Sequence, residues 1–345
     1  MEHTTIAVDV AKSVFEIGIS HRPGHVDKHH RLSRNQLAIF FAAQPPATVI
    51  MEACSSSHHW ARQFMRFGHD VKLLPPFYVR PYVHRSKTDR TDVKGMLEAW
   101  RNSEIRPVPI KTEAQQQLIA FHRVRSTWIA TRTARINTAR GILREFGIVV
   151  ADGASRVPTR VTALIEDADT ELPMGVRDLL HELVVEIRQL TSRIESVERQ
   201  LAAMAGETPV VERLRSIPGI GLLTATAFIA FVGNIERFPS SRHFACYLGL
   251  TPREHSSGLR RQLGHISKRG DAYIRMLLTH GARSVLLAAK SKSKSDKFST
   301  WAVDIDRRRG HNKASIAVAN KMARIVWAVW KYGNPYGVRS VPDSR

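Results

Sequence analysis

Cysteine is nearly absent from this chain, and long apolar runs are missing too. Of its 345 residues only Cys54 and Cys246 are cysteines, and they form no CxxC pair. This excludes a disulfide scaffold and a structural zinc site, and it favours a reducing compartment. The longest late apolar run, residues 221–232, is too short to span a bilayer, and Asp9 interrupts the early apolar run. We therefore expect a cytoplasmic protein with no signal peptide and no membrane partner.

Acidic residues are scarce relative to basic ones. The chain has 31 Asp and Glu against 52 Lys and Arg, which gives a net charge of +21 and a pI near 10.7. Residues 252–345 carry +14 and residues 111–150 carry +5, whereas residues 151–210 carry −5. Such a charge points to partners rather than to a fold: nucleic acid first, and an anionic membrane surface as the weaker alternative. We expect phosphate contacts on the two basic stretches.

The first hundred residues alternate strand and helix signals. Two β-rich runs joined by a short turn predict a hairpin, and three more runs predict further strands; the five runs cover residues 4–10, 13–19, 29–32, 48–52 and 71–74. Capping residues and apolar spacing predict helices over residues 35–43, 55–67 and 87–102. Several strands followed by helices predict an α/β domain over residues 1–108.

Two long helices are predicted between residues 109 and 208. The first, over residues 112–146, has six arginines and no acid between Ala114 and Arg144. We expect it to bind nucleic acid through Arg123, Arg125, Arg132 and Arg135. The second begins near Val176, and its apolar residues alternate three and four apart: Leu180, Leu183, Ile187, Leu190, Ile194, Val197, Leu201 and Met204. Packing inside the chain's own domain and coiled-coil dimerisation explain this seam about equally well.

Four carboxylates occupy positions that suggest a shared site. Asp9 lies on the first strand, Glu52 ends a later apolar strand, and Asp89 and Asp92 share one face at the start of a helix. Carboxylates brought together repel one another unless a cation binds between them. Hard oxygen ligands suit Mg²⁺ or Mn²⁺, and a pair of such ions can promote phosphodiester chemistry. Singly, each acid is more often a turn or cap residue; their order along the chain favours a site.

Residues 209–345 are predicted to be mostly helical. Within them, residues 217–221 predict the turn of a helix-hairpin-helix-like element, whose Gly219 and Gly221 let backbone N–H groups approach a phosphate. Residues 249–270 have few strand signals, and residues 290–297 predict a basic loop. Ser257 precedes a glycine in the first of these stretches, and basic residues follow it: Arg260, Arg261, Lys268 and Arg269. A serine among arginines could attack a phosphate, although such a loop by itself is usually a flexible turn.

Together these motifs resemble the DEDD transposases of the insertion-sequence one-ten family, which includes the Piv invertases. The acidic motifs of that family's RuvC-like domain are similar to Val8-Asp9-Val-Ala-Lys12, Met51-Glu52-Ala53 and Lys87-Thr-Asp89-Arg-Thr-Asp92. Its C-terminal transposase domain is similar to Ser216-Ile-Pro-Gly-Ile-Gly221, Phe244-Ala, Gly249-Leu-Thr-Pro252 and Ser257-Gly258. The resemblance covers about residues 4–335. Two departures are Ser256, a second serine in the serine motif, and Cys54-Ser55 after Glu52-Ala53.

The resemblance implies a ribonuclease-H-like (RuvC-like) catalytic domain over residues 1–108, long helices with a coiled coil over 109–208, and a transposase domain over 209–345. It assigns Mg²⁺ or Mn²⁺ to Asp9, Glu52, Asp89 and Asp92, and the role of nucleophile to Ser257, which would join covalently to DNA. It also implies a structured guide RNA and a homo-oligomer, a dimer or a tetramer.

Three functions follow from these observations. We expect a transposase or site-specific DNA recombinase. The alternative is a metal-dependent nuclease of the junction-resolvase type, in which water attacks and no covalent intermediate forms. A non-enzymatic nucleic-acid-binding protein is the third hypothesis, and it predicts no dependence on magnesium.

Overall fold

The computed structural model describes residues 4–22, 24–83, 89–151, 153–206, 208–291 and 296–337. Its contacts divide the chain into two compact units, Met1–Glu113 and Ala114–Arg345. The division into three domains at residues 108 and 208 stays a prediction.

A five-stranded mixed sheet forms the centre of the first unit. Its strands are β1 (Thr5–Asp9), β2 (Val14–Ser20), β3 (Lys28–Ser33), β4 (Thr48–Glu52) and β5 (Asp70–Leu74), in the spatial order β3-β2-β1-β4-β5. Strand β1 pairs antiparallel with β2 and parallel with β4, and β4 pairs parallel with β5. The mixed α/β character and the first hairpin are therefore confirmed.

The sheet buries both of its faces because apolar residues occupy both alternating sets of positions in its central strands. Ile6 and Val8 of β1 pack with the helices α1 (Arg34–Ala43) and α2 (Ser57–Arg66). Ala7 packs on the other face with α4 (Asp89–Trp100), together with the short segments α3 (Pro76–Val79) and η1 (Arg80–Tyr82). A Cβ atom on Gly18 would lie 2.4 Å from Val93 Cγ1, so glycine at this position lets α4 pack closely on β2.

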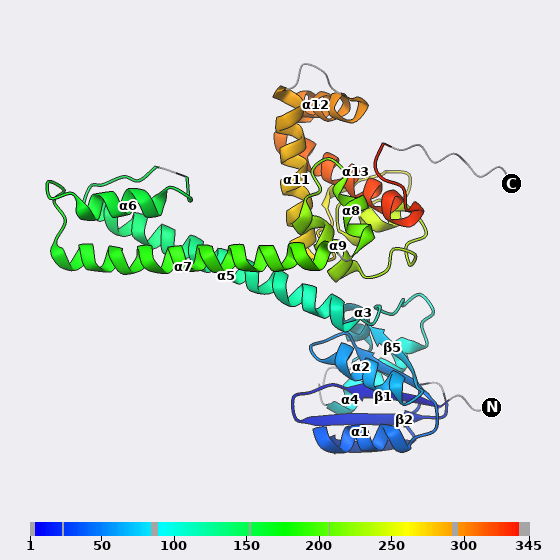
Figure 1. The fold of residues 1–345 in the computed structure, drawn as a ribbon. Helices are drawn as coiled ribbons and strands as arrows, with labels where there is room; N and C mark the ends of the chain where they lie inside the picture. The colour runs from blue at the N-terminus through cyan, green and yellow to red at the C-terminus, as the bar shows by residue number, and fades with distance from the viewer. Residues whose placement is uncertain are drawn as a thin grey trace. The chain divides into compact units, whose positions relative to one another are not determined.

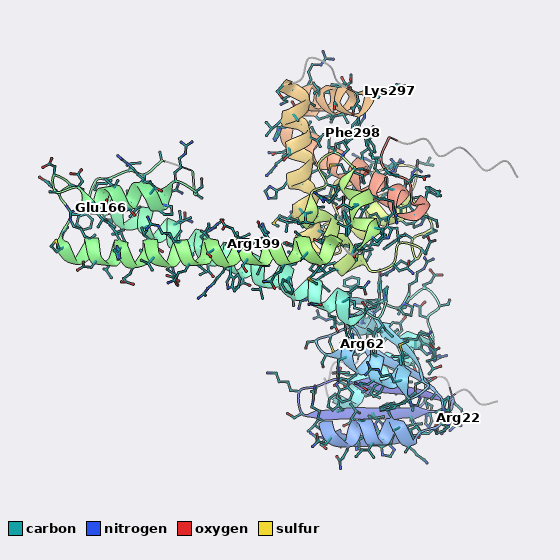
Figure 2. All side chains as sticks on the ribbon, viewed as in Figure 1. Arg22, Arg62, Glu166, Arg199, Lys297 and Phe298 are labelled. Atoms are coloured by element: carbon teal, nitrogen blue, oxygen red, sulfur yellow. The ribbon has the colours of Figure 1, made fainter. Side chains whose placement is uncertain are left out.

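Two antiparallel helices of 33 residues each, α5 (Glu113–Glu145) and α7 (Met174–Gly206), begin the second unit, with the shorter α6 (Val157–Glu166) beside them (Figure 1). Their shared core includes Ile136 and Leu143 of α5, Val161 of α6, and Leu180 and Ile187 of α7. In Figure 2, Glu166 marks the end of α6 and Arg199 lies on α7.

The apolar seam of α7 is used inside the chain. Six of its eight predicted positions are buried, and Val184 and Ala205 are buried where Leu183 and Met204 were expected. Along most of its length this seam packs against α5 and α6, so the intramolecular interpretation accounts for it. Dimerisation through a coiled coil stays a prediction.

The rest of the second unit is a helical domain around one apolar core. It contains α8 (Pro209–Arg215), α9 (Leu222–Val232), α10 (Ser241–Tyr247), α11 (Ala272–Ser291), α12 (Lys297–Arg309) and α13 (His311–Tyr332). The helix α13 contacts α8, α10, α11 and α12 through residues such as Met322 and Val326, so it organises this core. Of the predicted basic loop, residues 290 and 291 end α11 and Lys297 begins α12, whereas residues 292–295 lie outside the described residues.

Residues 249–270 differ from expectation, because two short strands form there. Strands β6 (Pro252–Glu254) and β7 (Leu263–Ile266) pair as an antiparallel hairpin. Nearly all of their residues are exposed, so the apolar alternation that signals a strand in the sequence is missing. Within the described ranges, none of the helices combines the length and the hydropathy needed to cross a membrane.

Candidate active site

Asp9 and Glu52 end two neighbouring parallel strands. The register pairs Val8 with Met51, so the next residue of each strand, Asp9 on β1 and Glu52 on β4, stands at the same edge of the sheet. Paired strands lie about 4.8 Å apart. Residues two apart on a strand share a face, so Asp9 lies on the face of Ala7 and Glu52 on that of Ile50. Both apolar residues pack on the face covered by α4. The fold therefore brings these two half-buried carboxylates together.

The helix α4 carries the other two predicted acids in its first turn. Asp89 is its first residue and Asp92 lies three residues later, so both start on one side of the helix. Between them, Arg90 extends to β2, where its Nε lies 3.7 Å from Glu16 Oε1. Glu16 is the cross-strand partner of Asp9, so the first turn of α4 lies beside the end of β1. The Asp89 side chain, and Lys87-Thr88 of its motif, lie outside what the structure describes.

Glu16 is a fifth acid that sequence reasoning missed. Its residue is only 7% exposed, and its Oε1 lies 3.8 Å from His29 Nδ1 and 3.7 Å from Arg90 Nε. As the cross-strand partner of Asp9 it projects from the same face of the sheet. A signal was present: a glutamate within the apolar strand Val14–Ser20 must find partners, because an unpaired buried carboxylate is costly.

The pKa of the Cys54 thiol is shifted by the two strand-end acids. Burial raises its pKa above the ordinary value, and the carboxylates of Glu52 and Asp9 raise it further. The negative charges of both acids therefore act on the same thiol, that of Cys54. Negative potential from hard oxygen groups attracts a small divalent cation, so the donor chemistry fits Mg²⁺ or Mn²⁺. Among the described residues, however, no three His, Cys, Asp or Glu side chains are grouped closely enough to hold a metal ion.

Ser257 lies at the turn of the β6–β7 hairpin. Its N–H donates to the Arg260 carbonyl at 3.3 Å, and the Arg260 N–H donates to the Ser257 carbonyl at 3.1 Å. The two residues between them are Gly258, with φ of +55°, and Leu259. Two central residues closed by a pair of backbone hydrogen bonds make a tight hairpin turn. The backbone at Ser257 therefore has the geometry of a hairpin turn.

The two adjacent serines differ in their hydrogen bonds. Ser256 Oγ donates to Glu254 Oε1 at 2.7 Å and accepts from the Gln262 N–H at 3.2 Å. Within the described part of the chain, no hydrogen bond occupies the hydroxyl of Ser257, which is exposed. Of the two hydroxyls, that of Ser257 is therefore the one open to a ligand.

Exposed basic residues surround this hairpin. Arg260 and Arg261 follow the turn, and Arg261 Nε lies 3.4 Å from Glu254 Oε1. Lys268 and Arg269 lie between β7 and α11, and both are exposed. Residues 252–270 have one acid, Glu254, against five Lys and Arg residues, so this surface suits a phosphate backbone.

The arginines of α5 are less free than expected. Arg125 Nη2 lies 2.6 Å from Glu198 Oε1 and Arg135 Nε lies 2.6 Å from Glu186 Oε2, both acids being on α7. Arg132 donates to Thr191 Oγ1 at 3.3 Å. Arg125 and Arg135 therefore have acidic partners on α7, although their own helix has no acid between Ala114 and Arg144. Arg123 is exposed. Binding of nucleic acid by the four arginines stays a prediction.

The two glycines of the α8–α9 turn have different surroundings. A Cβ on Gly219, where φ is +81°, would lie 2.7 Å from the carbonyl oxygen of Gly281 on α11. Gly219 therefore permits close packing on that helix. Gly221 begins α9 as its N-cap, and a Cβ there would meet nothing within 4 Å. Of the two, Gly221 is open to an approaching phosphate.

Comparisons with known proteins agree with this division of motifs. The model of the transposase IS116/IS110/IS902 family matches residues 211–298, and a DEDD transposase model of the IS110 type matches residues 6–148. A probable family 20 transposase of Pseudomonas aeruginosa is 40% identical over 330 residues, which cover 95% of this chain and 97% of the relative. The transposase for insertion sequence element IS1111A of Coxiella burnetii is 38% identical, over 94% of this chain and 88% of the relative.

A more distant relative extends the comparison. The pilin gene-inverting protein of Moraxella bovis is 24% identical, over 98% of this chain and 99% of the relative. The chain belongs to the IS110/IS116/IS902 family of transposases, as the resemblance of its motifs predicted. It is therefore an enzyme that cuts and rejoins DNA.

Proposed function

We propose that this transposase cuts DNA with two sets of groups: a divalent metal site of Asp9, Glu52, Asp89 and Asp92, and the hydroxyl of Ser257. The observation that carries the proposal is the placement of Asp9 and Glu52 at adjacent strand ends, beside the helix that starts with the other two acids. The strand order is β3-β2-β1-β4-β5. Strand β2 runs antiparallel to both of its neighbours, β1 and β3, and this arrangement supports a ribonuclease-H-like domain.

The chemistry proposed for Ser257 is a transfer of a phosphodiester from DNA to the enzyme. Its Oγ attacks the phosphorus, a P–Oγ bond forms, and the P–O bond to the departing strand breaks. The hydroxyl proton passes to the departing oxygen by way of solvent or a basic group. Arg260 and Arg261 stabilise the charge that develops on the phosphate oxygens. A strand hydroxyl then attacks the phosphorus, the P–Oγ bond breaks and Oγ takes up a proton; attack by the departed strand reverses the cleavage, and attack by another strand end joins new strands.

The carboxylates hold the metal that this chemistry needs. When bound, a divalent ion polarises the phosphoryl group and stabilises the leaving oxygen. Asp9 and Glu52 supply ligands from strand ends, and Glu16 orients through Arg90 the first turn of α4, which carries Asp92. Residues from both units thus take part in one reaction, and two copies of the chain could each supply one part. We propose a homo-oligomer for this reason.

We further propose a structured guide RNA as a partner and the cytoplasm as the place of action. The net charge of +21 supports a polyanionic partner beyond a short DNA site. RNA that copurifies with the protein, protects a defined fragment from nuclease and is required for cleavage would support guidance. Cleavage that is unchanged after RNase treatment and high-salt washing would contradict it.

The reaction is tested with a DNA duplex that spans an end of the element and is nicked so that cleavage cannot be reversed. Products are separated on denaturing gels with and without protease treatment. We expect a protein-linked strand with the wild type and with Ser256→Ala, and none with Ser257→Ala. Efficient cleavage without any protein-linked strand would contradict the serine pathway. It would support the alternative, a metal-dependent nuclease in which water attacks the phosphate.

A further inference from the structure

Leu259 occupies an unusual place for a large apolar side chain. It lies at the tip of the β6–β7 hairpin with 108% relative exposure, the highest among the large hydrophobic residues that the structure describes. The next highest is Val149, at 75%. Removing such a side chain from water is favourable, yet none of the residues that the structure describes covers it.

The tip that presents Leu259 is held in a defined shape. The paired backbone hydrogen bonds between Ser257 and Arg260 close the turn, and the His255 N–H donates to the Gln262 carbonyl at 2.9 Å below it. Ser256 joins the two strands again through its bonds to Glu254 and to the Gln262 N–H. An apolar side chain on a preorganised turn can insert into a partner at a small cost in entropy.

The residues beside Leu259 indicate what that partner is. Arg260 and Arg261 follow Leu259 directly and are exposed. Lys268 and Arg269, in the connection between β7 and α11, are exposed too. An apolar tip among cations fits a ligand that has phosphates outside and stacked apolar rings inside, which is nucleic acid. Proteins that bend or open DNA insert leucine or similar wedges between base steps while basic residues hold the backbone.

We propose that Leu259 is a wedge that enters a base step of the DNA next to the phosphate attacked by Ser257. The inference rests on the proposed role of Ser257. Ser257 and Leu259 are two positions apart, so their Cα atoms lie at most about 7.6 Å from each other, and successive base pairs are about 3.4 Å apart. The wedge therefore opens a step within about two base pairs of the reacting phosphate, which separates the bases there and bends the strand toward the serine.

The test uses the full-length protein and the nicked element-end duplex, with 2-aminopurine placed in turn at each base near the cleavage position. Unstacking raises the fluorescence of this base. We expect wild type and Ser257→Ala to raise the fluorescence at one step, Leu259→Ala to leave it unchanged, and Leu259→Met to retain most of the rise. Leu263→Ala, on the same hairpin but away from its tip, is the matched control and should behave as the wild type.

Cleavage of two substrates gives a second readout. Because unstacking costs a few kcal/mol per step, Leu259→Ala should cut the paired duplex about tenfold or more slowly than the wild type. A mismatch at the step should restore most of the rate, since that step is already open. An equal defect on both substrates, an unchanged fluorescence rise with Leu259→Ala, or a loss of oligomer in this variant alone would overturn the proposal. Because Ser257→Ala keeps the fluorescence rise, failure of the serine pathway is distinguished from failure of the wedge.

Discussion

The substitution Gly219→Ala tests what the glycines of the α8–α9 turn do. A Cβ there would lie 2.7 Å from the Gly281 carbonyl oxygen and 2.8 Å from both Met322 Cε and Val285 Cγ2. The backbone at Gly219 also has φ of +81°, which an L-residue adopts at a cost of roughly 1–2 kcal/mol. Forcing a methyl group into a packed core costs about 1–3 kcal/mol more. We therefore expect a loss of roughly 2–5 kcal/mol in the free energy of unfolding of the second unit.

Gly221→Ala is the matched control two residues away. Its φ is −88°, and a Cβ there would meet nothing within 4 Å, so we expect little change in stability. Urea unfolding of the full chain, followed by hydrogen exchange of peptides from α9 and α11, measures both variants. If Gly219→Ala is as stable as Gly221→Ala, the packing argument is refuted. If Gly221 lies against a phosphate, its variant should weaken DNA binding at unchanged stability.

Three further predictions concern the acids, a buried histidine and the net charge. Asp9→Asn, Glu52→Gln and Asp92→Asn should each abolish cleavage in Mg²⁺ or Mn²⁺ while DNA binding, measured by fluorescence anisotropy, stays within a few-fold of wild type; near-native cleavage by all three would contradict the metal site. Burial, and then Arg125, lower the pKa of His122 to about 4 from 6.5, so the unfolded state binds a proton between these values that the folded state does not. The free energy of unfolding should fall by up to about 1.4 kcal/mol per pH unit as the pH drops through that window, and it should fall less steeply in His122→Gln. Urea denaturation at several pH values measures this, and an equal pH dependence in the two proteins would show that the histidine is not involved. Affinity for DNA should fall roughly tenfold or more per doubling of salt if about five phosphates are contacted, and a shallow slope in a binding titration would contradict extensive phosphate contact.

Local patterns in the sequence predicted the elements of the first unit well. The strand over residues 48–52 is found with the predicted bounds, and Glu52 ends it, because an apolar run bounded by prolines and a polar cluster is a local signal. The order of the acids along the chain then indicated a shared site. Only the pairing of β1 with β4, a long-range contact, places Asp9 beside Glu52.

Features that depend on distant partners could not be predicted. The arginines of α5 have no acid on their own helix, and Glu186 and Glu198 reach Arg135 and Arg125 only because α7 folds back along α5. The close approach of Gly219 to α11 likewise depends on Gly281, 62 residues further along the chain. The β6–β7 hairpin was missed because exposed strands lack alternating burial.

If the carboxylates and Ser257 act in one reaction, the covalent protein–DNA adduct needs both, and the yield of this adduct is the most direct measurement. The adduct is measured in a single turnover on the nicked duplex in Mg²⁺, with peptide mapping to locate the linkage. We predict an adduct on Ser257 in the wild type, and none with Asp9→Asn although the serine is present. Mapping to another residue, or an adduct that forms equally well with Asp9→Asn, would contradict the account.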